Sequence, residues 1–470
     1  MQVSIIDKSD LHKRLLRIDP EYYQQIYLEN EKKISKKKII TLNDVCYITD
    51  GEHGTLKIYE TGYAKYYGAR NVLFGILDET SVEYITKEDH HRNKRSILHP
   101  HDVLISCVGT NIGCAAIVPT DIGNANIVRN VALLRSGSEK INNEYILSYF
   151  LSCYGKLSFK RVATGNAQPL ISLDNISEIP IVLLNKKFQK LVSNVINKSI
   201  LLREKAEKKY LETTLLLLSD IEVKKQLERR DNFFVKNYSE TVKSDRIDAE
   251  YFQPKYSELI ENIKKYSGGC DSLKNLVSIE KGIEIGSKKY LEKGIPFIRV
   301  RNLSQFNLTE EKYLSEELYN ELIKYQPEKG EILLSKDGTP GIAHYLNKSP
   351  KKMILSNGIL RLKIKNMKIN EEYLTLVLNS FIVQEQIKRD AGGSVILHWR
   401  PDQINDTIIP ILKEDIQIII KNKTEETYII RKKAKLLIQI AKKGVEIAIE
   451  NNEKIAGNWI NQELNRLDIT

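Results

Sequence analysis

The stretch Arg17-Ile-Asp-Pro-Glu-Tyr-Tyr23 returns 229 residues later as Arg246-Ile-Asp-Ala-Glu-Tyr-Phe252. Tyr67-Gly-Ala-Arg-Asn71 has a counterpart in Ile298-Arg-Val-Arg-Asn302, at nearly the same offset and in the same order. Self-similarity at a fixed period is the signature of a duplicated structural unit. The sequence therefore predicts two copies of one domain.

Further pairs keep this register through the rest of each copy. They are Asp102–Ser106 before Gly109-Thr110 with Glu331–Ser335 before Gly338-Thr339, Asn130 with Asn357, Ile179-Pro180 with Ile409-Pro410, and Leu201–Ala206 with Ile429–Ala434. Because the matches are collinear over most of the chain, we interpret them as a tandem duplication of a mixed domain followed by a long helix.

Within each copy, short β-branched and apolar runs alternate with Gly, Asn, Asp and Pro, which is typical of strands and turns. The expected strands include Val103–Ser106, Ala115–Val118, Ile332–Ser335 and Ile359–Leu362. Helical spacing of apolar residues predicts helices over Asn143–Leu151 and Glu371–Leu378. The predicted fold class is α+β, with two tandem, pseudo-equivalent α/β domains.

Two long helices are predicted over residues 186–222 and 414–450. The first contains no Pro or Gly from Lys186 to Ile221, and its expected apolar stripe comprises Phe188, Leu191, Val195, Leu202, Ala206, Leu211 and Leu215. Pairing with each other is the simplest way to bury both stripes; alternatively, each helix completes an ordinary core. We expect Gly444 to shorten the second helix.

These elements give an expected division of the chain. It consists of a first domain at 1–185, a first long helix at 186–222, a polar connector at 223–245, a second domain at 246–413, a second long helix at 414–450 and an unassigned tail at 451–470.

Composition indicates a folded, basic protein. Of the 470 residues, 41% are hydrophobic, and 72 Lys and Arg against 61 Asp and Glu give a net charge of +11, so a polyanion such as DNA is the first candidate partner. A Lys-rich surface without a polyanionic partner would give the same sum. The five cysteines contain no CxxC pair, and no signal or membrane-spanning pattern is present, so we expect a cytoplasmic protein.

The residue sets required for catalysis are not found in the sequence. It contains no GxxxxGK[ST] loop, no Asn-Pro-Pro-Tyr or Asp-Pro-Pro-Tyr set and no GxGxxG after a predicted strand. Gly282–Lys288 is expected to form a turn. His90-His91 and His99-Pro-His101 lack a matched Cys or carboxylate cluster, so we interpret them as loop residues and predict no metal site and no cofactor on this chain.

The repeat, the Asn-aliphatic and Gly-Thr elements, the Ile-Pro closures and the two long helices together resemble the specificity (S) subunits of Type I restriction-modification systems. The resemblance covers about residues 12–450. It implies two target-recognition domains separated by two long helices that form an antiparallel coiled coil. The second copy departs from the first at Gly393–Pro401, which is bulkier than its counterpart Gly165–Ile171.

The resemblance also implies a function and partners. The chain would be a non-catalytic DNA sequence-specificity subunit that reads a bipartite, asymmetric double-stranded site, with about residues 17–180 on one half-site and 246–410 on the other. Two methyltransferase (M) subunits would supply S-adenosylmethionine chemistry, and motor-nuclease (R) subunits would use ATP and Mg²⁺. The alternatives are a stand-alone restriction endonuclease with an unrecognised metal site, or a non-DNA protein-binding scaffold.

Arg and Lys suit guanine edges, and Asn and Gln suit adenine edges, so polar and basic loop residues are the candidate DNA contacts. In the first domain they are Lys65, Tyr67, Arg70, Asn71, Arg92, Lys94, Arg95, Asn111 and Arg129. In the second they are Lys288, Lys289, Arg299, Arg301, Asn302, Lys336, Thr339, Asn357 and Arg400. For Asn71 and Asn302, turn formation is at least as good an interpretation, because residues kept in both copies should build the scaffold.

Overall fold

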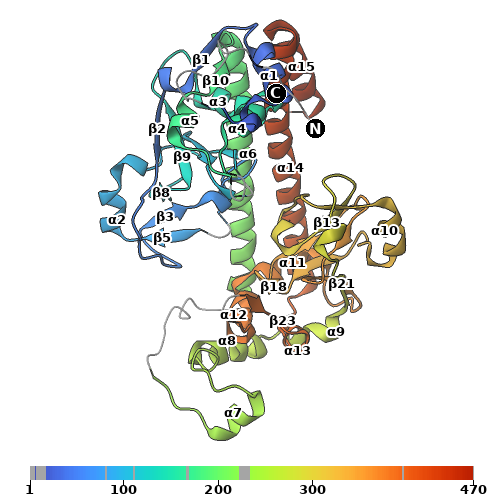
Figure 1. The fold of residues 1–470 in the computed structure, drawn as a ribbon. Coiled ribbons are helices and arrows are strands. Elements are labelled where there is room, and N and C mark those ends of the chain that lie inside the picture. The colour runs from blue at the N-terminus through green and yellow to red at the C-terminus, as the bar shows by residue number, and fades with distance from the viewer. Residues whose placement is uncertain are drawn as a thin grey trace. The chain divides into compact units, whose positions relative to one another are not determined.

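A computed structural model describes residues 6, 17–79, 82–109, 112–165, 169–221, 233–393 and 396–468 (Figure 1). The chain divides into two compact units. Unit 1 comprises Met1–Ala206 with Ile430–Thr470, and unit 2 comprises Glu207–Ile429. Each unit therefore contains one copy of the repeat and a part of each long helix.

The main sheet of each unit has the same antiparallel centre. In unit 1 the strand order is β2 (Cys46–Asp50), β9 (Val131–Ser136), β6 (Val103–Ser106), β7 (Ala115–Ile117) and β4 (Gly75–Ile76). In unit 2 it is β12 (Val277–Lys281), β21 (Ile359–Ile364), β17 (Ile332–Ser335) and β19 (Ala343–Tyr345). The expected strands are confirmed, because their continuous apolar runs are buried in the two cores.

A second, three-stranded sheet repeats as well. Its members are β5 (Glu83–Ile85), β3 (Ala64–Tyr67) and β8 (Ala125–Ile127) in unit 1, and β16 (Tyr313–Leu314), β13 (Ile295–Ile298) and β20 (Ile354–Leu355) in unit 2. In both, the central strand pairs antiparallel on one side and parallel on the other. The two-stranded sheets are β1 (Ile39–Thr41) with β10 (Pro180–Val182), β11 (Cys270–Ser272) with β23 (Ile408–Pro410), β14 (Leu303–Ser304) with β15 (Asn307–Leu308), and β18 (Asp337–Gly338) with β22 (Leu397–His398).

Five helices follow the same order in both units, and unit 2 has two more, α7 and α9, without an α-helical counterpart in the described part of unit 1. Unit 1 contains α1 (Gln25–Ile34), α2 (Lys87–Arg92), α3 (Asn143–Leu151), α4 (Cys153–Val162) and α5 (Leu173–Ser177). Unit 2 contains α7 (Tyr238–Ser244), α8 (Pro254–Lys265), α9 (Leu273–Leu276), α10 (Glu316–Glu321), α11 (Glu371–Asn379), α12 (Phe381–Asp390) and α13 (Pro401–Asn405). Short 3₁₀ turns lie at η2 (Pro20–Tyr23), η3 (Leu42–Asp44), η4 (Ala69–Asn71), η5 (Lys94–Ser96), η8 (Ser287–Lys289), η9 (Val300–Asn302) and η10 (Ile323–Tyr325).

Equivalent side chains hold the central helix of each unit. Asn142 caps α3, and Asn370 caps α11, in both cases by accepting from the backbone N–H three residues ahead. The predicted duplication is therefore confirmed at the level of strand pairing, helix order and capping.

The repeated stretch at the start of each copy, Arg17–Tyr23 or Arg246–Phe252, contacts the end of one helix. The Arg17 guanidinium pairs with Asp19 and lies 4.9 Å from the centre of the Tyr22 ring, while its Nη1 donates to Val162 O at the end of α4. In unit 2, Arg246 pairs with Asp248, lies 4.8 Å from the Tyr251 ring and donates to the backbone oxygen of Asp390 at the end of α12. The repeated Arg-Ile-Asp stretch thus makes the same helix-end contact in both units, while its isoleucines, Ile18 and Ile247, are exposed.

The two long helices are α6 (Lys186–Asp220) and α14 (Glu414–Glu450). In unit 1, Ser199 Oγ donates to Ala434 O at 2.7 Å, and Val195 packs in the same core as Leu437. In unit 2, Lys209 pairs with Glu426, and Leu217 shares a core with Ile420. Pairing of the two helices is therefore present inside each unit.

The apolar stripe predicted for α6 is wrong at its end. Leu211 and Leu215 are 58% and 54% exposed, whereas Thr213 and Leu217 are fully buried. At 100° per residue, Leu211 lies about 140° around the helix from Ala206, whereas Thr213 is seven residues from Ala206 and returns to the same face. The stripe therefore continues at heptad spacing through Thr213.

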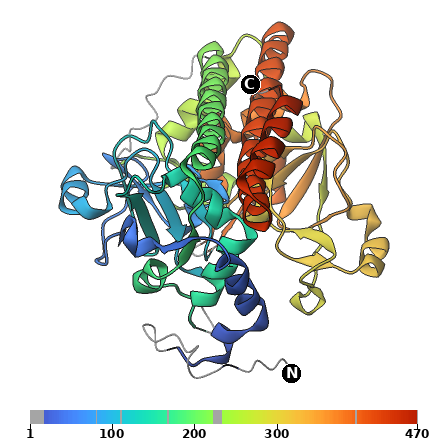
Figure 2. The same cartoon turned by 90° about the horizontal axis from the view of Figure 1, so that it is seen from above.

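Gly444 does not shorten the second helix, which continues to Glu450. A Cβ at position 444 would lie 2.5 Å from Ile460 Cδ1, so the glycine makes room for α15 (Glu453–Arg466), a helix in the tail to which the sequence assigned no structure. Figure 2 shows α15 beside α14 at the red end of the chain. Residues 223–232 of the expected connector lie outside the described residues, and the rest of the connector includes α7. No helix within the described ranges is long and apolar enough to cross a membrane.

Candidate nucleic-acid interface

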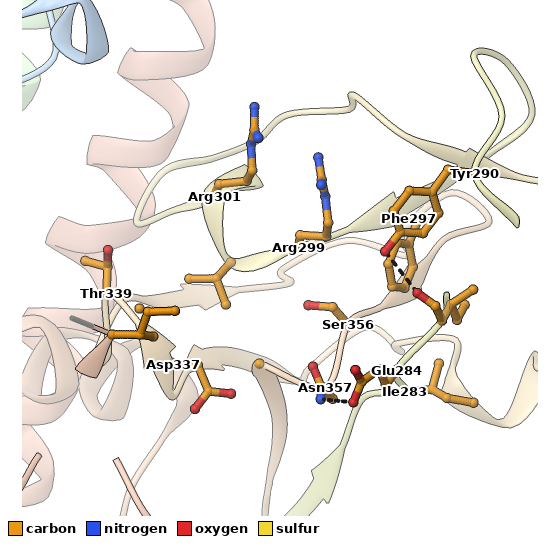
Figure 3. Close-up of a pocket in the computed structure, with 15 residues that line it drawn as sticks. Ile283, Glu284, Tyr290, Phe297, Arg299, Arg301, Asp337, Thr339, Ser356 and Asn357 are labelled. Atoms are coloured by element: carbon orange, nitrogen blue, oxygen red, sulfur yellow. Dashed lines mark hydrogen bonds between the residues drawn. The ribbon is translucent and has the colours of Figure 1, made fainter. Parts of the chain in front are cut away.

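Unit 2 has an open pocket of about 490 Å³ where strand ends and turns meet (Figure 3). It is lined by residues 283–285 after β12, the turn 299–301 after β13, residues 337–339 after β17 and the turn 356–358 before β21, with Tyr290, Phe297 and Ile396. Four of the predicted contacts meet here: Arg299, Arg301, Thr339 and Asn357. The fold therefore gathers residues that are up to about a hundred positions apart in sequence.

The turn after β13 is built by Asn302, which is 2% exposed. Its Oδ1 accepts from the Arg299 N–H at 3.1 Å, and its Nδ2 donates to Thr309 Oγ1 at 3.3 Å. In unit 1, Asn71 is 1% exposed; its Oδ1 accepts from the Gly68 N–H at 2.9 Å, and its Nδ2 donates to the Asp78 carbonyl oxygen at 3.0 Å. Both asparagines thus form turns, which is the alternative that the sequence left open.

The pocket has a cationic side and an acidic side. Figure 3 shows Arg299 and Arg301 opposite Asp337 and Asn357. Arg299 Nη2 and Arg301 Nη2 lie 3.0 and 2.9 Å from the same oxygen, Oε2 of Glu311. The Nε atom of Arg299 is buried and has no hydrogen-bond partner in the described part of the chain. Such guanidinium groups are suited to phosphate oxygens and to guanine edges.

The opposite side of the pocket is fixed by other side chains. Asn357 Nδ2 donates to Glu284 Oε2 at 3.0 Å. Burial alone would raise the pKa of Asp337, but hydrogen bonds from Lys336 and His398 outweigh burial and lower that pKa, so the carboxylate is charged. His398 approaches through the pairing of β18 with β22. The bulky Gly393–Pro401 segment therefore contributes to one wall of the pocket through Ile396.

An aromatic pair forms the third wall. The ring centres of Tyr290 and Phe297 lie 5.5 Å apart at 36°, and the Tyr290 hydroxyl donates to Ile285 O. The Arg299 guanidinium lies 5.8 Å from the centre of the Tyr290 ring. Phe297 is 2% exposed, so only Tyr290 offers a partly accessible aromatic face beside the cation, on which a nucleic-acid base could stack.

The hydrogen bonds of the two units establish the residue equivalence at this edge. Val131 N donates to Val128 O, and Ile359 N donates to Ser356 O, each at 3.0 Å. Arg129 of unit 1 is therefore the equivalent of Asn357 of unit 2. The pairing of Asn130 with Asn357, expected from the sequence, is wrong by one residue. Arg129 and Asn357, both predicted DNA contacts, therefore occupy the equivalent turn in their respective units.

The other predicted residues of unit 1 have defined surroundings. Lys65 Nζ and the Tyr67 hydroxyl bond the two oxygens of Glu79, at 2.9 and 2.8 Å, and Tyr67 is fully buried. Arg70 pairs with Glu83 at 2.7 Å, and Arg129 is exposed. Of these residues, Arg70 and Arg129 correspond to Arg301 and Asn357 of the unit 2 pocket, whereas Lys65 and Tyr67 correspond to β13 residues that do not line it.

A second group lies on α2 and η5 of unit 1. Arg92 pairs with Asp89, Lys94 is exposed, and Arg95 bonds Asp50 and the Gly51 carbonyl oxygen. Asn111 lies outside the described residues.

His90 and His91, expected in a loop, belong to α2, because Thr86 caps a short helix with Glu88 and Asp89 in its first turn.

The remaining predicted residues of unit 2 do not line the pocket. Lys288 and Lys289 are exposed on η8, Lys336 pairs with Asp337, and Arg400 pairs with Asp402 at 3.3 Å. Sequence reasoning missed Glu284, Tyr290, Asp337 and Glu311. Their acidic or aromatic character gave no signal for DNA contact, and only the tertiary fold brings them to the arginines.

No protein-family model and no curated protein matches the sequence. Among solved structures, the chain is similar to the Type I restriction-modification system S subunit from M. genitalium, with 12% identity, a TM-score of 0.29 and coverage of 90% of this chain and 95% of that one. It is also similar to the HsdS subunit from Thermoanaerobacter tengcongensis, at 13% identity, TM-score 0.29 and 88% and 97% coverage. A third similar chain comes from a study of complex assembly and conformational transition of the type I R-M system, at 12% identity, TM-score 0.27 and 90% and 96% coverage.

Proposed function

We propose that this chain is the non-catalytic DNA sequence-specificity subunit of a Type I restriction-modification complex. It reads a bipartite, asymmetric site, with residues 1–185 on one half-site and residues 246–413 on the other. The helices at 186–222 and 414–450 act as the spacer.

One observation carries this proposal: two units with the same fold present different side chains at equivalent surface turns. Arg129 corresponds to Asn357, and Gly68 corresponds to Arg299. A shared scaffold with different readers fits a duplex site whose halves differ in sequence. The net charge of +11 supports a polyanionic partner.

The proposed complex supplies the chemistry that this sequence lacks. Two M subunits bring S-adenosylmethionine and adenine methylation, and R subunits bring ATP-driven translocation and Mg²⁺-dependent cleavage. The complex works in the cytoplasm, where the host DNA is accessible to it.

Sequencing the methylated bases of cells that carry this chain and its M subunits tests the proposal. We expect one split motif with two different halves, which disappears when the gene for this chain is deleted. A methylation pattern that does not change on deletion contradicts the proposed function. Cleavage of DNA by the isolated chain with Mg²⁺ would instead favour the stand-alone endonuclease, and sequence-blind binding would favour the scaffold.

The spacer role has a separate test. Removing seven residues from both α6 and α14 shortens each helix by about 10 Å, or about three base pairs of B-DNA. The gap of the methylated motif should shrink while both half-sites stay the same. An unchanged gap refutes the spacer role and leaves the half-site proposal standing.

A further inference from the structure

One carboxylate oxygen in unit 2 contacts two arginines of the pocket edge. Glu311 Oε2 lies 3.0 Å from Arg299 Nη2 and 2.9 Å from Arg301 Nη2. The three side chains are 30%, 24% and 45% exposed, so the cluster lies at the surface and can be reached by a duplex. Because one acid serves two cations, the local charge is +1 rather than +2.

Unit 1 contains a related contact with a single cation. Glu79 accepts from Lys65 Nζ and from the buried Tyr67 hydroxyl. Both acids lie just after the segment that bonds back to the asparagine: Asp78 N donates to Asn71 O, and Thr309 N donates to Asn302 O, so Glu79 lies one residue and Glu311 two residues beyond this bond. In each copy, an acid within two residues of this bond therefore holds basic side chains: Lys65 on β3 in unit 1, and Arg299 and Arg301 after β13 in unit 2.

We propose that Glu311 and Glu79 are specificity-determining residues, each for one half-site. This inference rests on the proposed function. Each acid has two effects: it removes one positive charge that would otherwise bind phosphates of any sequence, and it holds the basic side chains in fixed rotamers. A held guanidinium loses less entropy when it forms a bidentate contact with a base edge. Each acid thus increases the discrimination between DNA sequences and lowers the affinity for DNA of any sequence.

The test compares Glu311→Gln with Glu310→Gln in the full-length chain. Glu310 is exposed and has no ion pair among the residues that the structure describes, so its substitution changes the net charge equally without releasing an arginine. Binding is measured by fluorescence anisotropy on the selected duplex and on a random duplex, over a series of salt concentrations. Thermal melting confirms that both variants fold.

For Glu311→Gln we expect a salt dependence steeper by about one unit on random DNA. We also expect about tenfold weaker discrimination at the second half-site, with the first half-site unchanged. Glu310→Gln should leave the discrimination of both half-sites as in the wild type. Glu79→Gln should weaken the first half-site alone.

Glu311→Asp separates charge from positioning, because the shorter side chain keeps the charge but cannot reach both arginines. It should lower discrimination without steepening the salt dependence. If Glu311→Gln and Glu310→Gln give equal slopes and equal discrimination while the wild type keeps its split preference, the inference is wrong and the proposed function survives. A wild type with no sequence preference overturns the proposed function itself.

Discussion

The Nδ1 atom of His101 lies 2.7 Å from Oε1 of Glu144, which is in the first turn of α3. The hydrogen bond to Glu144 raises the pKa of His101 against the opposing effect of burial. Burial alone would raise the pKa of Glu144, but hydrogen bonds from His101 and the Glu144 backbone outweigh it, and that pKa is lowered. The charged pair therefore stabilises unit 1.

This pair predicts a pH-dependent stability of unit 1. The histidine contribution is complete below its ordinary pKa of 6.5 and is lost as the pH rises through the raised value. The glutamate contribution is complete above its ordinary pKa of 4.5 and is lost as the pH falls through the lowered value. As the pH rises above about 6.5 and through the raised pKa of His101, we expect unit 1 to lose about 1 kcal/mol, a figure reduced for partial exposure.

His101→Asn should abolish this loss, because asparagine carries no charge and tolerates the positive φ of 68° at this position. Urea denaturation at several pH values, followed by Trp459 fluorescence in a Trp399→Phe background, reports on unit 1 alone, since the sequence has two tryptophans. Equal pH dependence in the variant and its parent would show that the pair is not responsible.

Arg129 and Asn357 predict a separable effect on the two half-sites. Asn357→Ala should cost about 1–3 kcal/mol of discrimination in the second half-site, and Arg129→Ala should do the same in the first. Each half-site serves as the internal control for the other. Binding selection from a randomised duplex pool measures the preference at every position, and a uniform loss over both halves would argue for phosphate contacts instead.

The buried ion pair of unit 2 predicts a large stability effect. Arg361 donates to both oxygens of Glu331 at 2.8 Å, and the two side chains are 7% and 4% exposed. Glu331→Ala leaves a buried guanidinium without its main partner and should cost about 3–5 kcal/mol.

Asp406→Ala is the matched control, because its pair with Lys274 is exposed and should contribute less than about 1 kcal/mol. Denaturation followed by Trp399, which is buried in unit 2, measures both variants. Similar losses for the two substitutions would contradict a special role for the buried pair.

Gly444 and Ile460 predict a coupled pair of substitutions. Gly444→Ala gains about 1 kcal/mol of helix propensity but places a methyl group against Ile460, and overpacking costs about 1–3 kcal/mol. Ile460→Ala opens a cavity and should cost about 2–5 kcal/mol. The double variant should be more stable than the sum predicts by about 1 kcal/mol or more, as a double-mutant cycle on the Trp459 transition would show. Strict additivity would mean that α15 does not pack on Gly444.

Much of the fold could be predicted because the signals were local or repeated. The Arg17 and Arg246 stretches predicted the duplication, and the lack of Pro and Gly from Lys186 onward predicted α6. The start of α14 was predicted, whereas the expectation that Gly444 shortens the helix was wrong. The error at Leu211 arose because the expected stripe left the heptad spacing that the buried Thr213 keeps.

The candidate site was harder to predict, because it depends on contacts between distant segments. Arg299 and Arg301 could be selected by residue type, but their shared partner Glu311 could not, since an isolated acid in a loop has no signature. Gly444 was misread for the same reason: a glycine in a helix weakens it locally, and only the packed Ile460 explains why it is there.

The composition of unit 1 has a consequence for biosynthesis. The core of unit 1 contains Tyr145 and Val195 together with Leu437, Ala441 and Val445. Almost three hundred residues separate Tyr145 from Val445. Unit 2, by contrast, is one uninterrupted segment from Glu207 to Ile429. As the ribosome releases the chain, unit 2 can fold first. The N-terminal segment of unit 1 cannot complete its core until the C-terminal segment has been synthesised.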